Sequence, residues 1–261
     1  MMITGPVPAL RLAVALPVLW LSSCTTTDSG SDLWSDALAT KDLAAIEQLL
    51  AGDEADANRS TPDGKTALMF AAQQRDAELV ARLLGAGADV NARNANGGTA
   101  LMYAALGGDA TVTGLLLDAG ARHDARAKLG WTPLEVAAVK GHTFVARTLL
   151  ESGADPDVRD TYGWTPLMRA VDTRRLEFVR MLLEETGADL SARQESGVTA
   201  LHIAAASGDP AMVRLLVGHG AERAATDNGG RTAADIAQSL GHAEIADYLS
   251  GTELPERLDG S

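Results

Sequence analysis

Residues 130–155 read G-W-T-P-L-E-V-A-A-V-K-G-H-T-F-V-A-R-T-L-L-E-S-G-A-D, and the same outline recurs along most of the 261-residue chain. Its threonine-led head occurs six times, at spacings of 33, 33, 33, 34 and 33 residues. The heads begin at Thr66, Thr99, Thr132, Thr165, Thr199 and Thr232. A fixed internal period of this length predicts an elongated stack in which each unit packs mainly on its neighbours.

Each unit carries the signals of two short helices. A glycine two residues before the threonine suits a turn with positive φ, and the threonine can cap the first helix. Pro133 and Pro166 follow where a missing N–H costs nothing. The period and the Thr-Pro-Leu heads, with His202 in the place of the family's histidine, resemble ankyrin repeats. The resemblance implies an all-α ankyrin-repeat solenoid of about seven helix-turn-helix units with β-turn fingers.

Two departures from the period locate softer joints. Most units turn between their helices at a glycine, but Arg75 and Arg174 stand there instead. A left-handed residue with a Cβ costs about 1 kcal/mol, so these turns are expected to be strained or reshaped. The single 34-residue spacing reflects one extra residue between Leu183 and Gly187, which predicts a longer helix end.

The repeats divide the chain into five parts. The expected boundaries are a cleaved signal peptide at 1–23, a polar tether at 24–31, a capping repeat at 32–60, five repeats at 61–226, and a capping repeat with its tail at 227–261. Terminal repeats usually depart from the pattern because one face meets water, which fits the missing threonine head of the first unit.

The first residues predict export and a lipid anchor. Leu12 to Leu21 is an apolar run too short to span a bilayer, with the layout of a secretory signal. Leu21-Ser22-Ser23-Cys24 follows, and it resembles the lipobox of bacterial lipoproteins, which implies lipidation of Cys24, the one cysteine in the chain. The alternative is an ordinary cleaved signal with an incidental cysteine. The expected address is the bacterial cell envelope, at the outer membrane and facing the periplasm.

The excess of acidic residues argues against two classes of binding partner. The chain has 22 basic and 35 acidic residues, a formal net charge of −13. This excess argues against nucleic acid, whose binding depends on neutralised phosphates. It also argues against lying flat on anionic lipid, so membrane contact is expected only through the anchor. A monomer with a protein partner is the expected state.

Catalysis and cofactors are not expected. The chain lacks the phosphate-binding G-x-x-x-x-G-K-S/T and nucleophile G-x-S-x-G patterns, and its histidines fall in different roles of the repeat. No metal site, cofactor or catalytic residue is therefore predicted. The nearest material for an enzyme is Glu135, Arg169 and Asp172 on adjacent first helices, which we expect to form a surface ion-pair cluster instead.

The resemblance to ankyrin proteins places binding on the fingers and the first helices, on the concave side. Trp131 and Trp164 occupy equivalent finger positions, and Leu129 and Tyr162 each precede a turn glycine. Leu106 and Val139 end neighbouring first helices. These residues predict an aromatic, apolar contact patch. The alternative is that each indole only covers its own turn.

A row of arginines runs beside this patch. Arg93, Arg126 and Arg159 recur with Arg59 and Arg193 at spacings of 33 or 34 residues. One interpretation is that each pairs with a nearby acid such as Asp160, Asp124 or Asp157. The other is a basic row beside aromatic anchors, a combination common at interface hot spots, which could orient a partner with acidic groups.

The function that follows is a non-enzymatic protein-protein interaction module on a membrane-anchored lipoprotein. Two biological roles stay open, a scaffold for an envelope enzyme and an inhibitor or immunity protein against a toxin or hydrolase that acts in the periplasm. A glycan or small-molecule binder that uses the indoles as platforms is a further alternative.

Overall fold

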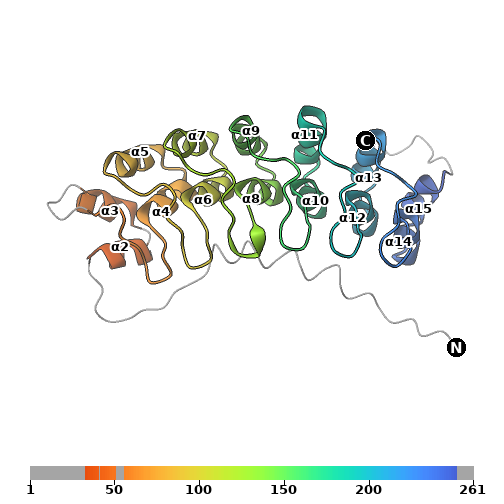
Figure 1. Ribbon diagram of the computed structural model, residues 1–261, viewed down its shortest axis with the longest axis horizontal. Coiled ribbons are helices and arrows are strands. Elements are labelled where there is room, and N and C mark those ends of the chain that lie inside the picture. Colours follow the sequence, from red (N-terminus) through yellow and green to blue (C-terminus); the bar gives the residue numbers. More distant parts are fainter. Residues whose placement is uncertain (1–32, 41, 51–55, 252–261) are drawn as a thin grey trace, which may run out of the picture.

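The computed structural model describes residues 33–40, 42–50 and 56–251. These residues form seven consecutive helix pairs, stacked side by side (Figure 1). The first helices are α2 (Leu33–Thr40), α4 (Ala67–Gln74), α6 (Ala100–Gly107), α8 (Pro133–Lys140), α10 (Pro166–Asp172), α12 (Ala200–Ser207) and α14 (Ala233–Ser239). The second helices are α3 (Leu43–Leu50), α5 (Ala77–Gly85), α7 (Ala110–Asp118), α9 (Thr143–Glu151), α11 (Leu176–Thr186), α13 (Pro210–Gly218) and α15 (Ala243–Leu249). The predicted all-α ankyrin-repeat solenoid is confirmed.

The threonine heads start the first helices as expected. The hydroxyls of Thr66 and Thr165, for example, accept from the backbone N–H groups of Met69 and Met168. Each such bond satisfies a helix donor that has no partner within the helix. The threonine heads are therefore helix caps, as the sequence predicts.

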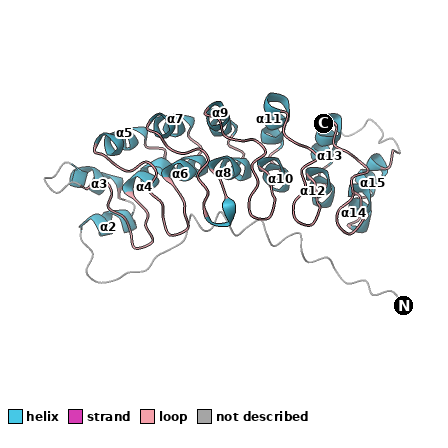
Figure 2. Cartoon of the chain, in the orientation of Figure 1, coloured by secondary structure: helices cyan, strands magenta, loops and turns pink. Residues whose placement is uncertain are grey.

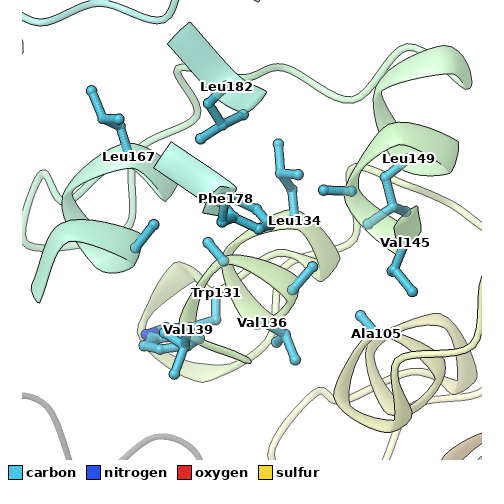
Figure 3. Close-up of a cluster of buried hydrophobic side chains, with 14 of the residues drawn as sticks. Ala105, Trp131, Leu134, Val136, Val139, Val145, Leu149, Leu167, Phe178 and Leu182 are labelled. Carbon is cyan, nitrogen blue, oxygen red and sulfur yellow. The ribbon is translucent and has the colours of Figure 1, made fainter. Parts of the chain in front are cut away.

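The first and second helices form two layers, with a row of long loops along one side of the first layer (Figure 2). The core between them is built of small and branched residues, with alanines such as Ala104 and Ala137 completely buried. Figure 3 shows Leu134 of α8, Val145 of α9 and Leu167 of α10 in one cluster, so successive units share a continuous core. No described helix reaches the length and apolarity that a membrane crossing requires.

Both predicted departures from the period are present. Arg75 and Arg174 adopt positive φ angles of 64° and 58°, in the left-handed region. α11 has 11 residues, whereas the second helices on either side of it have 9, because the inserted residue and the residue before Gly187 are both helical. The insertion therefore lengthens one helix and leaves the stacking of the core intact.

The long loops that lead into each threonine head are the fingers. Each finger after the first donates one backbone hydrogen bond to the preceding finger, as Thr161 N–H does to the Leu129 carbonyl at 3.0 Å. The same bond joins Ala95 to Asp63, Lys128 to Asn96, Glu195 to Tyr162, and Asn228 to Ser196. The fingers are therefore cross-linked into one row along the stack.

Candidate functional site

The two central indoles are packed around an arginine. The guanidinium carbon of Arg169 lies 4.6 Å from the ring centre of Trp131 and 4.5 Å from that of Trp164. Trp131 and Trp164 are only 5% and 7% exposed, and Arg169 is 4% exposed. The prediction of an exposed aromatic patch is therefore wrong in the placement of both rings, which form a cation–π sandwich.

The physical reason lies on α10. Arg169 occupies the helix position that holds buried Val136 in the preceding unit and Ile203 in the following one. A guanidinium in this apolar layer needs compensation, and a buried charge is tolerated only when it is paired. The two indoles cover its faces, and the buried carboxylate of Asp160 accepts its Nη2–H. This burial could have been predicted from the sequence, because Arg169 is the one charged residue at a repeat position that is otherwise apolar.

Glu135 is a second buried polar group at the same joint. Its Oε2 accepts from the backbone N–H of Thr132 at 2.8 Å and lies 3.1 Å from the Thr132 hydroxyl. Its Oε1 is buried without a hydrogen-bond partner. Burial is the main cause that raises the pKa of Glu135 to about 8, and the nearby Asp160 charge adds to it. Burial therefore favours the neutral, protonated form of Glu135 in the folded chain.

The expected surface cluster of Glu135, Arg169 and Asp172 is not formed. Glu135 and Arg169 are buried, and the carboxylate that pairs with Arg169 belongs to Asp160. Asp172 is half-buried, and burial raises its pKa to about 6. The charge of Arg169 is thus compensated from within the fold by Asp160, and Glu135 bonds Thr132 at the start of its own helix.

Leu129 and Tyr162 remain as the accessible apolar residues of the central fingers. Tyr162 is 46% exposed, and Leu129 is half-buried against the core. The bond from Thr161 to the Leu129 carbonyl places their two fingers side by side. Of the other expected contact residues, Leu106 is half-buried, whereas Val139 is buried and its carbonyl accepts from Arg175 Nε at 2.9 Å. Val139 is therefore corrected from a surface residue to a packing residue.

The finger that contains Leu129 has its own backbone conformation. Leu129 has a φ of 63° within a short 3₁₀ turn, Lys128–Gly130. In the neighbouring finger, Asp160 Oδ1 accepts from the backbone N–H groups of Tyr162 and Trp164, whereas Ala127 at the equivalent place has no side-chain acceptor. Without that acceptor the turn closes differently, and Leu129 enters the left-handed region, which is unusual for a bulky residue. This turn was not predicted from the sequence.

The arginine row is confirmed as a spatial series, with one correction. Each guanidinium from Arg93 to Arg193 donates to the backbone carbonyl at the equivalent position of the next unit, as Arg126 does to Arg159 at 2.8 Å. The other bonds run from Arg93 to Arg126, from Arg159 to Arg193 and from Arg193 to Thr226. Arg59 is aligned one position earlier than these four, with Ala92 rather than Arg93.

The expected pairing of this row with nearby acids is not found in the described residues. Asp160 pairs with Arg169, and Asp124 pairs with Arg122. Among the described residues, Arg93, Arg126, Arg159 and Arg193 form no ion pair with a carboxylate. All four are exposed, so their charges face solvent.

The remaining predictions concern metals and the N-terminus. Over residues 33–40, 42–50 and 56–251, histidine, cysteine and acidic side chains form no cluster of three suited to a metal ion. His202 instead bonds the Thr199 hydroxyl and the Arg231 carbonyl, within the repeat. Cys24, the signal peptide and the tether lie outside the described residues, so lipidation stays a prediction.

Comparison with known proteins agrees with this architecture. The family described as "Ankyrin repeats (3 copies)" matches residues 35–127, 108–194 and 190–255. The crystal structure of the human ASB11 ankyrin repeat domain superposes with a TM-score of 0.75 at 28% identity, covering 87% of this chain and 99% of that chain.

Curated relatives match over shorter stretches. Human protein phosphatase 1 regulatory subunit 27 is 36% identical over 85 residues, 33% of this chain and 54% of the relative. The human ARF GTPase-activating protein GIT1 is 42% identical over 66 residues, 24% of this chain and 9% of the relative. The chain thus spans about half the length of the first relative and about a tenth of the second. Ankyrin repeats are typically non-catalytic and indicate a protein–protein interaction module. With the family pattern matched from residue 35 to residue 255, the chain belongs to the ankyrin repeat family.

Proposed function

We propose that this chain is a non-enzymatic module that binds a partner protein in the bacterial envelope through its finger row. The observation that carries the proposal is the position of Tyr162, a 46% exposed aromatic side chain on a finger that is bonded to both neighbours. Its finger donates to the Leu129 carbonyl through Thr161, and the Tyr162 carbonyl accepts from Glu195. An exposed tyrosine on a fixed backbone is the kind of anchor that interface hot spots use.

Rigidity supports the proposal because binding to a preformed surface avoids the cost of ordering loops. The N–H of Tyr162 is held by Asp160 Oδ1 at 2.8 Å. Asp160 is itself held by its ion pair with Arg169, whose guanidinium packs against the two indoles. The buried ion pair and the two indoles therefore support the contact residue from beneath, and the contact surface consists of Tyr162 and Leu129 on neighbouring fingers.

The buried polar groups beneath the fingers support a non-enzymatic role. Arg169 is ion-paired and stacked, and Glu135 caps its own helix through Thr132. Neither group is open to a reacting molecule from solvent, because both are buried. The side chains of this joint that could take part in catalysis are thus committed to the fold.

The binding surface is tested by crosslinking in intact cells. A photoreactive amino acid in place of Tyr162 in the full chain should capture a specific protein, and Tyr162→Ala should weaken recovery of that protein. Phe144→Ala is the matched control, since Phe144 is a 71% exposed aromatic residue on α9, away from the fingers. Equal recovery from both variants, at unchanged helicity by circular dichroism, would disprove the finger surface.

The envelope address rests on residues 1–31 and has a separate test. Replacing Cys24 with Ser should move the protein from the membrane fraction to the soluble fraction and prevent labelling by a fatty-acid probe. A Thr25→Ser variant leaves the cysteine in place and serves as the control. Unchanged membrane association of the Cys24→Ser protein would remove the lipid anchor from the proposal and leave the binding surface unaffected.

A further inference from the structure

The arginine row presents four positive charges at a regular spacing. Arg93, Arg126, Arg159 and Arg193 lie at equivalent positions of four successive units, and all four are exposed. Each is oriented by a bond to the next unit's carbonyl rather than by an acid. A carbonyl oxygen is a neutral acceptor, so it fixes the guanidinium without cancelling its charge.

The side chains are held close to the fingers as well. Arg126 Nη1 lies 3.3 Å from the Gly130 carbonyl of its own finger, in addition to its bond with Arg159. Arg193 Nη1 repeats this arrangement with the Gly197 carbonyl at 3.2 Å. A guanidinium held at two points has little rotamer freedom left to lose, so a carboxylate can bind it at reduced entropic cost.

We propose that this row binds an extended acidic segment of the partner protein, in polyproline II conformation, with a carboxylate at every third residue. The inference rests on the proposed function, because it names the chemistry of the partner that the finger row would hold. It goes beyond that function by assigning the segment's conformation and the spacing of its charges.

The spacing follows from the packing of the units. Packed helices lie about 8–10 Å apart, so equivalent arginines recur at about that distance. A polyproline II helix rises about 3.1 Å per residue with three residues per turn, which places every third side chain on one face, about 9.3 Å apart. A β-strand would alternate every third side chain between its two faces, so it fits this row less well.

Electrostatics favour a short acidic segment over a long polyanion. The chain carries a formal net charge of −13, so an extended anion meets repulsion wherever it leaves the row. The row supplies four exposed positive charges in a line, and none of them is paired with a carboxylate among the described residues. Binding is expected to weaken with salt, because exposed charge pairs are screened beyond about 10 Å at 0.1 M.

The test uses rigid synthetic peptides as rulers. Fluorescein-labelled (Glu-Pro-Pro)₄ and (Glu-Pro-Pro-Pro)₄ carry the same number of carboxylates, but only the first places them on one face at the spacing of the row. Anisotropy titration with the full chain should give at least about 10-fold tighter binding of the first peptide. Arg126→Gln combined with Arg159→Gln should weaken it by about 5- to 30-fold, if each exposed pair contributes about 0.5–1 kcal/mol.

Arg174→Gln is the matched control for the arginine variants. Arg174 is also exposed and also donates to a carbonyl of the next unit, that of Ser207, but it lies between the two helices and outside the row. Its replacement should change the affinity for the peptide by less than 2-fold. An equal loss in the Arg174 variant, or equal affinity for the two peptides, would overturn the assignment.

Two further outcomes separate this inference from the proposed function. A protein crosslinked at Tyr162, together with no binding of (Glu-Pro-Pro)₄, would disprove the acidic segment and leave the binding module standing. Binding of labelled (dT)₁₂ as tight as that of the peptide would show a generic polyanion site and overturn the peptide assignment. Peptide binding without a crosslinked protein would support the row and count against the Tyr162 surface.

Discussion

The carboxylate of Asp160 and the guanidinium of Arg169 form a buried ion pair that ties a finger to the helix it introduces. The pair is shielded by Trp131 and Trp164, whose rings lie on the two sides of the guanidinium. Asp160 also accepts from two backbone N–H groups of its finger through Oδ1. One carboxylate thus shapes the finger with one oxygen and neutralises the core arginine with the other.

Replacing Asp160 with Asn separates these two roles. Asparagine keeps an oxygen for the finger but leaves Arg169 as an uncompensated buried charge, which typically costs about 3–5 kcal/mol. Urea unfolding followed by tryptophan fluorescence should show that the free energy of unfolding falls by an amount in this range. The control is Asp124→Asn, which breaks the exposed pair with Arg122 and should leave the urea midpoint unchanged. Equal midpoints for the two variants would contradict the assignment of a structural ion pair.

Glu135 should make the stability of the stack depend on pH. Its pKa is raised from 4.5 to about 8 in the folded chain, so between these values the folded state holds a proton that the unfolded state has released. The free energy of unfolding is therefore highest below pH 4.5, as far as this group is concerned, and falls as pH rises toward 8. The expected loss is at most about 5 kcal/mol, at 1.36 kcal/mol per pH unit.

The Glu135→Gln variant removes this titration while keeping an oxygen for Thr132. It should be more stable than the parent chain at pH 8, with a smaller decline of unfolding free energy between pH 5 and 8. The half-buried Asp172, with a pKa of about 6, should preserve a smaller decline of the same sign at lower pH. Glu151→Gln on the exposed face of α9 is the control. A parent chain whose stability does not fall over this range would refute the prediction.

Two helical glycines should respond to alanine in opposite directions. A Cβ on Gly107 would lie 2.8 Å from the Gln73 carbonyl oxygen, so α4 and α6 would have to separate. Overpacking of this kind typically costs about 1–3 kcal/mol. A Cβ on Gly114, within α7, meets nothing within 4 Å, and alanine there should add up to about 1 kcal/mol of helix stability. Thermal unfolding by circular dichroism compares them, and a stabilised Gly107→Ala variant would contradict the close approach.

Most of the fold could be predicted from the sequence because the local structure of each repeat is determined by residues within that repeat. The threonine caps, the positive φ of Arg75 and Arg174 and the longer α11 all follow from residues within one unit. The face of the stack was harder to predict because it depends on contacts between units. Trp131 was expected at the surface. It is buried because its ring packs against the guanidinium of Arg169 in the next unit.

Leu129 illustrates the same limit on a smaller scale. Its left-handed backbone follows from the missing side-chain acceptor at Ala127, which becomes visible only when neighbouring fingers are compared. The arginine row was recognised as a series, but its periodicity alone does not distinguish pairing with acids from bonding to carbonyls. The carbonyls of equivalent residues in successive units settle that question in the structure.

The arginine bonds all point in one direction along the chain, which sets the order in which they can form. All four run from an earlier unit to the unit that follows it in the chain, from Arg93 through to Thr226. Because the chain emerges N-terminus first, each of these guanidinium groups gains its acceptor only after the next repeat has emerged. From Arg93 to Arg193, the most recently folded unit therefore ends in an arginine without its acceptor, and the next unit completes that bond.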